Sequence, residues 1–102
     1  VALSNLAVNA VRHAPPGSAV VLRAMGAGPQ VRFEVEDAGP GVHESLQERV
    51  FEPVVRGDGE AAPGVGLGLH IAREVARAHG GTIGVNAAPG GGALFWMEIP
   101  TA

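Results

Sequence analysis

The chain has 102 residues and a net charge of −3, with no cysteine and no lysine, and this composition excludes several classes of function. Without cysteine there are no disulfides, no thiol catalysis and no zinc–thiolate sites. Without lysine there is neither a Walker A loop nor a Schiff-base mechanism. The seven basic residues are scattered arginines, a poor pattern for binding nucleic acid or an anionic membrane.

The length predicts a single domain, and the 46% hydrophobic content predicts a folded globular chain. No apolar run approaches the roughly 20 residues of a membrane span. No basic leader typical of a signal peptide opens the sequence. Because the first residue is Val1 rather than methionine, we expect the chain to be part of a longer protein.

Residues 1–14 predict an amphipathic helix that ends before a Pro-Pro-Gly stop. At about 100° per residue, one apolar arc is expected to face inward. This arc contains Leu3, Leu6, Ala7, Ala10, Val11 and Ala14. A separate polar arc contains Asn5, Asn9, Arg12 and His13.

Asn5 and Asn9 lie one helical turn apart and are candidate ligands of a metal–phosphate group. An amide oxygen is a hard, neutral ligand suited to Mg²⁺, which keeps waters and takes phosphate oxygens as its other ligands. Arg12, one turn further, could then contact the phosphate charge. A polar helix face in solvent explains the same pattern, so the helix alone leaves both interpretations open.

Residues 19–25 and 31–36 predict two strands joined by a glycine-rich hairpin connection, the second with a clear period of two. The second strand ends at Asp37, which precedes Gly39 and Gly41. A carboxylate there can accept a hydrogen bond from an adenine amine, and the glycines let a flat base approach the backbone. An ordinary turn with an Asp side-chain bond is the alternative.

The middle of the chain is less informative. A short helix is expected around residues 44–49, and Phe51-Glu52-Pro53 with Arg56 follows it. Residues 54–66 are rich in glycine and poor in large apolar groups, which predicts a mobile loop. We interpret His43 as a surface-loop residue rather than as a phospho-acceptor.

Residues 67–79 predict a second amphipathic helix with a glycine C-cap at residues 80–81. Its expected inward residues are Leu67, Ile71, Val75 and Ala78. The preceding Gly64-Val-Gly66-Leu-Gly68-Leu69 lacks the dinucleotide fingerprint. It does place unobstructed N–H groups at a helix N-terminus, which suits an anion. A flexible helix entry is the alternative.

Residues 82–86 and 93–99 predict a final hairpin, with Trp96 expected in the core. The element order is helix, two strands, short helix, loop, helix, two strands. This order predicts an α+β fold, a two-layer α/β sandwich in which helices pack on one face of a mainly antiparallel mixed sheet.

Four of the segments described above, taken together and in their order along the chain, resemble the ATP-binding catalytic domain of bacterial sensor histidine kinases. That domain belongs to the superfamily of gyrase, heat-shock chaperones and mismatch-repair ATPases, with the Bergerat-type ATP-binding fold. Residues 5–14 match the N box, 37–41 the first glycine box, 51–56 the F box and 64–69 the second glycine box. Residues 78–83 and 90–100 match the closing segments of the kinases, so the resemblance covers nearly all of residues 3–100.

The resemblance implies that the chain binds ATP with Mg²⁺. Asn9 would be the Mg²⁺ ligand and Asp37 the carboxylate that reads adenine. The residues facing the phosphates would be Asn5, Arg12 and His13, with Arg56 a candidate for the γ-phosphate. The glycine boxes would contribute Gly39, Gly41, Gly64, Gly66, Leu67, Gly68 and Leu69.

By the same resemblance, the chain would present the γ-phosphate to a histidine on a separate dimerisation domain, and a response-regulator Asp would take it later. That acceptor domain and the first strand of the family's domain have no match here, so residues 1–102 are expected to be a truncated catalytic domain. We expect a cytoplasmic location for this segment, with an inner-membrane sensor as a candidate parent protein, and no contact of this segment with nucleic acid or membrane. The alternatives are an anti-sigma-factor-type serine kinase and a degenerate nucleotide-sensing or protein-interaction module.

Overall fold

The computed structural model describes residues 2–43, 47, 49–52 and 68–101. These residues form, in chain order, α1 (Ala2–His13), β1 (Val21–Ala27), β2 (Gln30–Glu36), α2 (Gly68–Ala78), β3 (Thr82–Ala87) and β4 (Ala93–Pro100). Both predicted long helices and both predicted hairpins are therefore confirmed. The loop predicted at 54–66 and most of the short helix predicted at 44–49 lie outside the described residues.

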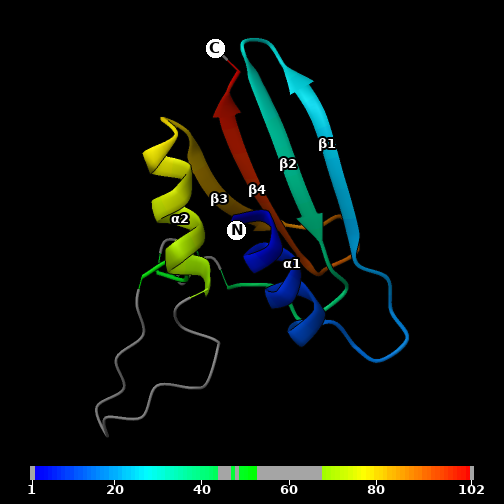
Figure 1. The fold of residues 1–102 in the computed structure, drawn as a ribbon. Coiled ribbons are helices and arrows are strands. Elements are labelled where there is room, and N and C mark those ends of the chain that lie inside the picture. Colours follow the sequence, from blue (N-terminus) through cyan, green and yellow to red (C-terminus); the bar gives the residue numbers. More distant parts are fainter. Residues whose placement is uncertain (1, 44–46, 48, 53–67, 102) are drawn as a thin grey trace, which may run out of the picture.

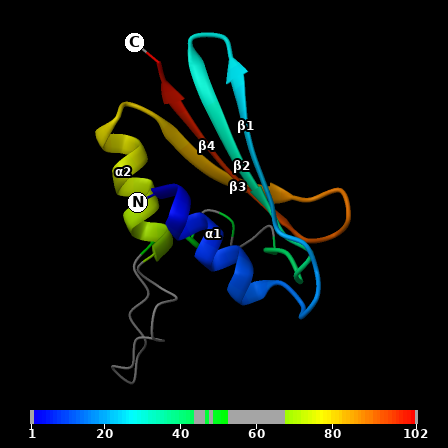
Figure 2. The same cartoon turned by 45° about the vertical axis from the view of Figure 1, so that its right-hand side comes forward.

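The four strands form one sheet in the order β1-β2-β4-β3, and every neighbouring pair is antiparallel. The chain leaves the sheet after β2 and returns to it as β3 after α2, and β4 then pairs between β2 and β3. Figures 1 and 2 show both helices on the same side of the sheet. The predicted two-layer α+β architecture is confirmed.

The core lies between the helices and the inward face of β2, β4 and β3. Because side chains alternate along a strand, Val35, Phe95 and Val85 face inward and lie opposite one another across three strands. The Phe95 side chain is 2% exposed, and its ring meets the ring of Phe51 edge-to-face at a centroid distance of 6.0 Å. Phe51, which lies between β2 and α2 in the sequence, is thus anchored in the core.

The buried faces of the two helices agree only in part with the predicted ones: Leu6 and Ala10 are buried as expected, and Leu3 and Val75 pack against the core. Three small or medium side chains are buried on each helix: Ala2, Leu6 and Ala10 on α1, and Leu69, Ala72 and Ala76 on α2. Val11 is 65% exposed, Ile71 is 42% exposed and Ala78 is exposed, so these inward assignments were wrong. The helices contact each other, and alanines on the contact face allow a close approach that bulky side chains would prevent.

The C-terminus of α2 is capped as predicted. The Gly81 N–H donates to the Ala76 carbonyl oxygen (2.8 Å) and the Gly80 N–H to that of Arg77 (2.9 Å). With φ of +74° at Gly80, these two bonds form a Schellman motif. The cap turns the chain directly into β3.

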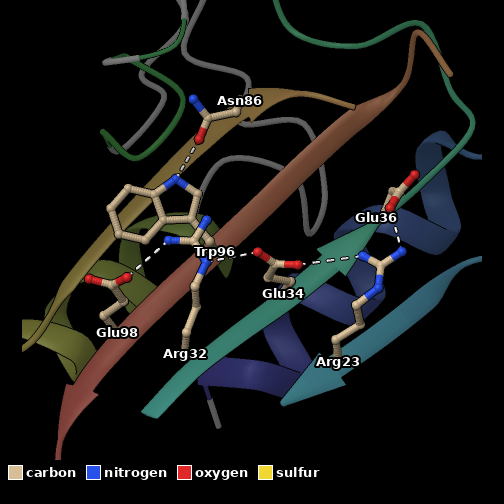
Figure 3. Close-up of polar contacts among 7 residues, drawn as sticks. All are labelled: Arg23, Arg32, Glu34, Glu36, Asn86, Trp96 and Glu98. Carbon is tan, nitrogen blue, oxygen red and sulfur yellow. Dashed lines mark hydrogen bonds and ion pairs between the residues drawn. The ribbon is translucent and has the colours of Figure 1, made fainter. Parts of the chain in front are cut away.

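The face of the sheet opposite the helices carries a ladder of ion pairs (Figure 3). The Arg32 guanidinium donates to Glu34 (2.7 Å) and to Glu98 (3.0 Å), and the Arg23 guanidinium donates to Glu36 (2.7 Å). The hydrogen bond with Glu34 raises the pKa of Arg32 above its ordinary value. These pairs join β1, β2 and β4 across the face that the helices leave open.

Trp96 lies on this open face and not in the core, so the prediction for it was wrong. Strand alternation explains the error, because Phe95 and Met97 on either side face the helices. The Arg32 guanidinium lies 4.8 Å from the centroid of the indole ring, and Trp96 Nε1 donates to Asn86 Oδ1 (2.7 Å). Trp96 is therefore half-buried between a cation and an amide.

No helix within the described residues is long and apolar enough to cross a membrane.

Candidate nucleotide-binding site

The end of β2, the start of β4, the C-terminus of α1 and the N-terminus of α2 meet at one end of the molecule. Because β2 and β4 are antiparallel, Asp37, the residue after β2, lies beside Ala93, the first residue of β4. The Asp37 N–H donates to the Ala93 carbonyl oxygen at 3.0 Å. These two segments, which are distant in sequence, therefore pair with each other and form one wall of the candidate site.

Asp37 is 5% exposed and is the one charged side chain buried in the described part of the chain. Its Oδ1 accepts the N–H of Gly39 (2.8 Å) and the N–H of Ala93 (3.3 Å). Two main-chain donors compensate the loss of water around a buried carboxylate. Both bonds fix the same oxygen, so the carboxylate is oriented and neither bond uses Oδ2.

Two glycines allow the main chain to close around this carboxylate. A Cβ at Gly92 would overlap the carbonyl oxygen of Asp37, and a Cβ at Gly39 would lie 2.5 Å from the carbonyl oxygen of His13. No larger residue fits either position without displacing backbone. The close approach brings the end of α1 and the start of β4 against the turn after β2.

A cavity of about 300 Å³ opens beside Asp37. Apolar walls come from Val42, Val50, Leu69 and Phe95, and polar groups come from Asn9, His13 and Asp37. The volume lies at the lower end of the range of small-molecule sites, about 300–1,000 Å³. A mostly apolar slot with a few polar groups suits a flat, partly polar ligand.

Five of the predicted site residues line this cavity: Asn9, His13, Asp37, Gly41 and Leu69. Gly39 adjoins it through its hydrogen bond to Asp37, and Gly68 is the first residue of α2. Asn5 and Arg12 belong to α1 but are not among the described lining residues. The predicted residues Arg56, Gly64, Gly66 and Leu67 lie outside the described residues.

Sequence reasoning missed the apolar part of the wall apart from Leu69. Phe95 was not identified, because Trp96 next to it was expected in the core, and nothing local indicated that Phe95 would border a ligand cavity. Pro40 lies between the two glycines of the predicted turn and could have been included. His43, expected in a surface loop, is exposed and also borders the cavity.

Residues 1–102 match the sequence family described as histidine kinase-, DNA gyrase B- and HSP90-like ATPases. The chain belongs to this family. The chain is 43% identical over 98 residues to the alginate biosynthesis sensor protein KinB of Pseudomonas aeruginosa, over 96% of this chain and 16% of KinB.

Solved structures of histidine kinases share the fold. Full-length ShkA in complex with AMPPNP is 42% identical, with a TM-score of 0.80 over 97% of this chain and 20% of the ShkA chain. ThkA in complex with the response regulator protein TrrA is 28% identical, with a TM-score of 0.79 over 99% of this chain and 28% of the ThkA chain. The chain is therefore the ATP-binding catalytic domain of a histidine kinase, and it spans under a third of each of these longer proteins.

Proposed function

We propose that this catalytic domain binds ATP with Mg²⁺ and presents the γ-phosphate for transfer to a histidine on a separate dimerisation domain. The observation that carries the proposal is Asp37, a buried carboxylate at an apolar cavity with Oδ1 held by two backbone N–H groups. Its Oδ2 would then accept a hydrogen bond from the exocyclic amine of adenine. The AMPPNP in the ShkA complex is an ATP analogue, which supports the assignment by relationship.

The same geometry predicts selectivity for adenine. Guanine carries a carbonyl oxygen where adenine carries the amine, and two acceptors facing each other in a buried site leave both unpaired. The apolar walls, including Leu69 and Phe95, would contact the faces of the base. ATP should therefore be preferred over GTP.

The polar residues of α1 would serve the phosphate end of the nucleotide. Within the described part of the chain no group of three or more His, Cys, Asp or Glu residues could hold a metal ion. A metal bound mainly by phosphate oxygens and one amide, that of Asn9, fits this donor set. Bound Mg²⁺ would offset the charge of the phosphates. Asn5, Arg12, His13 and Arg56 remain proposed phosphate contacts, and the glycines around α2's start remain proposed main-chain donors.

Within a kinase, this chain would bind and orient ATP while another domain supplies the attacking nitrogen. Positioning and charge stabilisation supply most of the catalysis of phosphoryl transfer. The proposed partners are the dimerisation domain and a response-regulator receiver domain, as in the complex of ThkA with TrrA. We propose that this reaction takes place in the cytoplasm, where ATP is available.

The test is a calorimetric titration of the chain with AMPPNP, with and without Mg²⁺, and with a GTP analogue. We expect metal-dependent binding that prefers the adenine nucleotide.

A variant of Asp37 tests the role of its carboxylate. Asp37→Asn keeps the side-chain shape but places an NH2 donor where Asp37 has the acceptor Oδ2, so that two donors would face each other. This variant should bind AMPPNP about tenfold more weakly or worse. Glu52→Gln makes the same charge change at an exposed residue that is not among the cavity's described lining residues, and should leave binding unchanged. Equal affinity for both nucleotides, or a folded Asp37→Asn variant with unchanged affinity, would contradict the proposal.

A further inference from the structure

β1 is the edge strand of the sheet on the side away from α2. In the part of the chain that the structure describes it pairs only with β2, and every residue from Val21 to Gly26 is exposed. Figures 1 and 2 show β1 beyond both helices, with the start of α1 on the side of α2. No residue of β1 lines the cavity beside Asp37. The outer edge of β1 is therefore a surface that the proposed nucleotide site does not use.

The alternation of hydrogen bonds across β2 shows which main-chain groups of β1 are open. The Asp37 N–H donates to the Ala93 carbonyl oxygen, toward β4, so Glu36 and every second residue before it direct their groups toward β1. Their partners in β1 are Val21, Arg23, Met25 and Ala27. The outward N–H and carbonyl groups therefore belong to the residues between these: Leu22, Ala24 and Gly26. An open strand edge of this kind is a template for another strand.

β1 has none of the features that usually protect an edge strand from pairing. All seven residues pair one-to-one with β2, so the strand has no bulge, and it contains no proline. Its one charged side chain, Arg23, points along the sheet to Glu34 and Glu36 and away from the edge (Figure 3). β1 therefore presents a regular, unprotected edge over its whole length.

The hydrogen-bonding pattern of this edge is complementary to itself. Ala24 is the middle residue of Val21–Ala27, and its main-chain groups point outward. Two antiparallel copies of β1 can therefore pair over the whole strand about a two-fold axis at Ala24. Leu22 then lies opposite Gly26 of the second copy, and each facing pair of outward residues exchanges two main-chain bonds. The register that uses all of β1 is thus one in which its open groups meet.

The side chains fit the same register on both faces of the sheet. Leu22 pairs with the buried Val35, so its side chain lies on the helix side, where it is 51% exposed. Gly26 of the second copy leaves room for it, since a Cβ at Gly26 would meet nothing within 4 Å. On the open face Arg23 lies opposite Met25 of the second copy, and each Arg23 keeps its own two glutamates. No bulky pair and no pair of like charges is directly opposed.

We propose that two copies of this chain associate through β1 into one continuous antiparallel sheet, with the two-fold axis at Ala24. Main-chain bonds between the edges hold the pair together, and the burial of Leu22 and Met25 adds an apolar contribution. A contact limited to one strand of each copy is small, so the dimer is reversible and weak, in the micromolar to millimolar range. Both nucleotide cavities stay open because β1 lines neither of them.

The test begins with the 102-residue chain itself. Sedimentation equilibrium over a range of protein concentrations up to about 1 mM measures the molar mass, and a dissociation constant at or below that concentration is expected to be detectable. NMR hydrogen exchange at low and high concentration follows the amides of Leu22, Ala24 and Gly26. We expect the mass to rise from monomer to dimer, and exchange at these three amides to slow as the dimer forms.

Opposite charges at the two-fold axis provide the decisive variants. Ala24 is exposed, and Ala24→Lys would place two lysines directly opposite each other, as Ala24→Glu would place two glutamates. Each variant alone should dimerise about fivefold more weakly or worse. An equimolar mixture should dimerise again, because lysine then faces glutamate, and this recovery shows that both variants are folded. Ala78→Lys, an exposed site on α2, should change the dissociation constant less than about twofold.

Four results would overturn the proposal. They are a chain that remains monomeric up to about 1 mM, exchange at the three outward amides that does not depend on concentration, an Ala24→Lys variant that associates as the parent does, and a mixture of the two charge variants that stays monomeric.

Discussion

Asp37 is held by main chain from several directions, and the contacts come from two parts of the sequence, the turn after β2 and the start of β4. Its own N–H bonds to Ala93, its Oδ1 accepts from Gly39 and Ala93, and its carbonyl oxygen faces Gly92. A carboxylate fixed in this way needs no reorganisation to accept a hydrogen bond from a ligand. At the scale of residues, the site depends on glycines as much as on the charged group.

Gly92→Ala should therefore destabilise the domain. Its Cβ would overlap the Asp37 carbonyl oxygen, and main chain yields little, so we expect a loss of about 1–3 kcal/mol or more in the free energy of unfolding. Urea denaturation followed by circular dichroism measures this. Gly90→Ala, two residues away with open space around its Cβ, should change stability by less than about 1 kcal/mol in either direction. Similar stability of the two variants would contradict the close approach of Gly92 to the Asp37 carbonyl oxygen.

At the scale of elements, α1 and α2 contact each other, and most of the residues that they bury are alanines. Ala10, Ala72 and Ala76 are fully buried, while the larger Val8, Val11 and Ile71 remain exposed. Small residues let two helices approach closely enough that the end of α1 and the start of α2 both reach the cavity beside Asp37. The helix pair thus sets the distance between Asn9 and Leu69 across that cavity.

Ala72→Leu should disrupt this helix pair. Ala72 is fully buried, so added methylenes have no space and should cost about 1–3 kcal/mol of stability. Ala78→Leu makes the same change at an exposed position of the same helix and should stay within about 0.5 kcal/mol of the parent. Thermal unfolding of both variants measures the difference. A stable Ala72→Leu variant would mean that the helices are not in close contact there.

At the scale of the whole molecule, one core joins the helices to the sheet. Phe95 and Met97 of β4, the central partner of β2 and β3, pack in the same cluster as Leu6 of α1 and Leu69 of α2. A domain with a single shared core unfolds as one unit when its layers have no separate cores. Neither layer can therefore lose its structure without exposing the other.

This arrangement predicts a single unfolding transition. Trp96 reports on the sheet by fluorescence because it is the only tryptophan and lies on the open face, while far-ultraviolet circular dichroism reports mainly on the helices. The two signals should change with the same midpoint in urea. A fluorescence midpoint separated from the circular dichroism midpoint would show that sheet and helices unfold independently.

Much of the local structure and part of the site could be predicted because short-range patterns encode them. The apolar period of α1, the alternation of β2, the Gly80–Gly81 cap and the position of Asp37 after a strand all depend on neighbours within a few residues. The errors at Val11, Ile71 and Trp96 share one cause. A hydrophobic residue on a helix or strand can face either the core between the two layers or solvent. Which of the two it faces depends on how the other layer packs against its element.

By itself, the sequence determined the elements, their order and the residue types of a candidate nucleotide pocket: an amide pair on one helix, a carboxylate and glycines at the end of a strand, and glycines at the start of a second helix. Only the tertiary structure decided the strand order β1-β2-β4-β3, which brings Ala93 and Gly92 against Asp37. The physical reason is the range of the interactions. Helix and turn formation depend on contacts between near neighbours, whereas strand pairing and layer packing depend on residues that are distant in sequence.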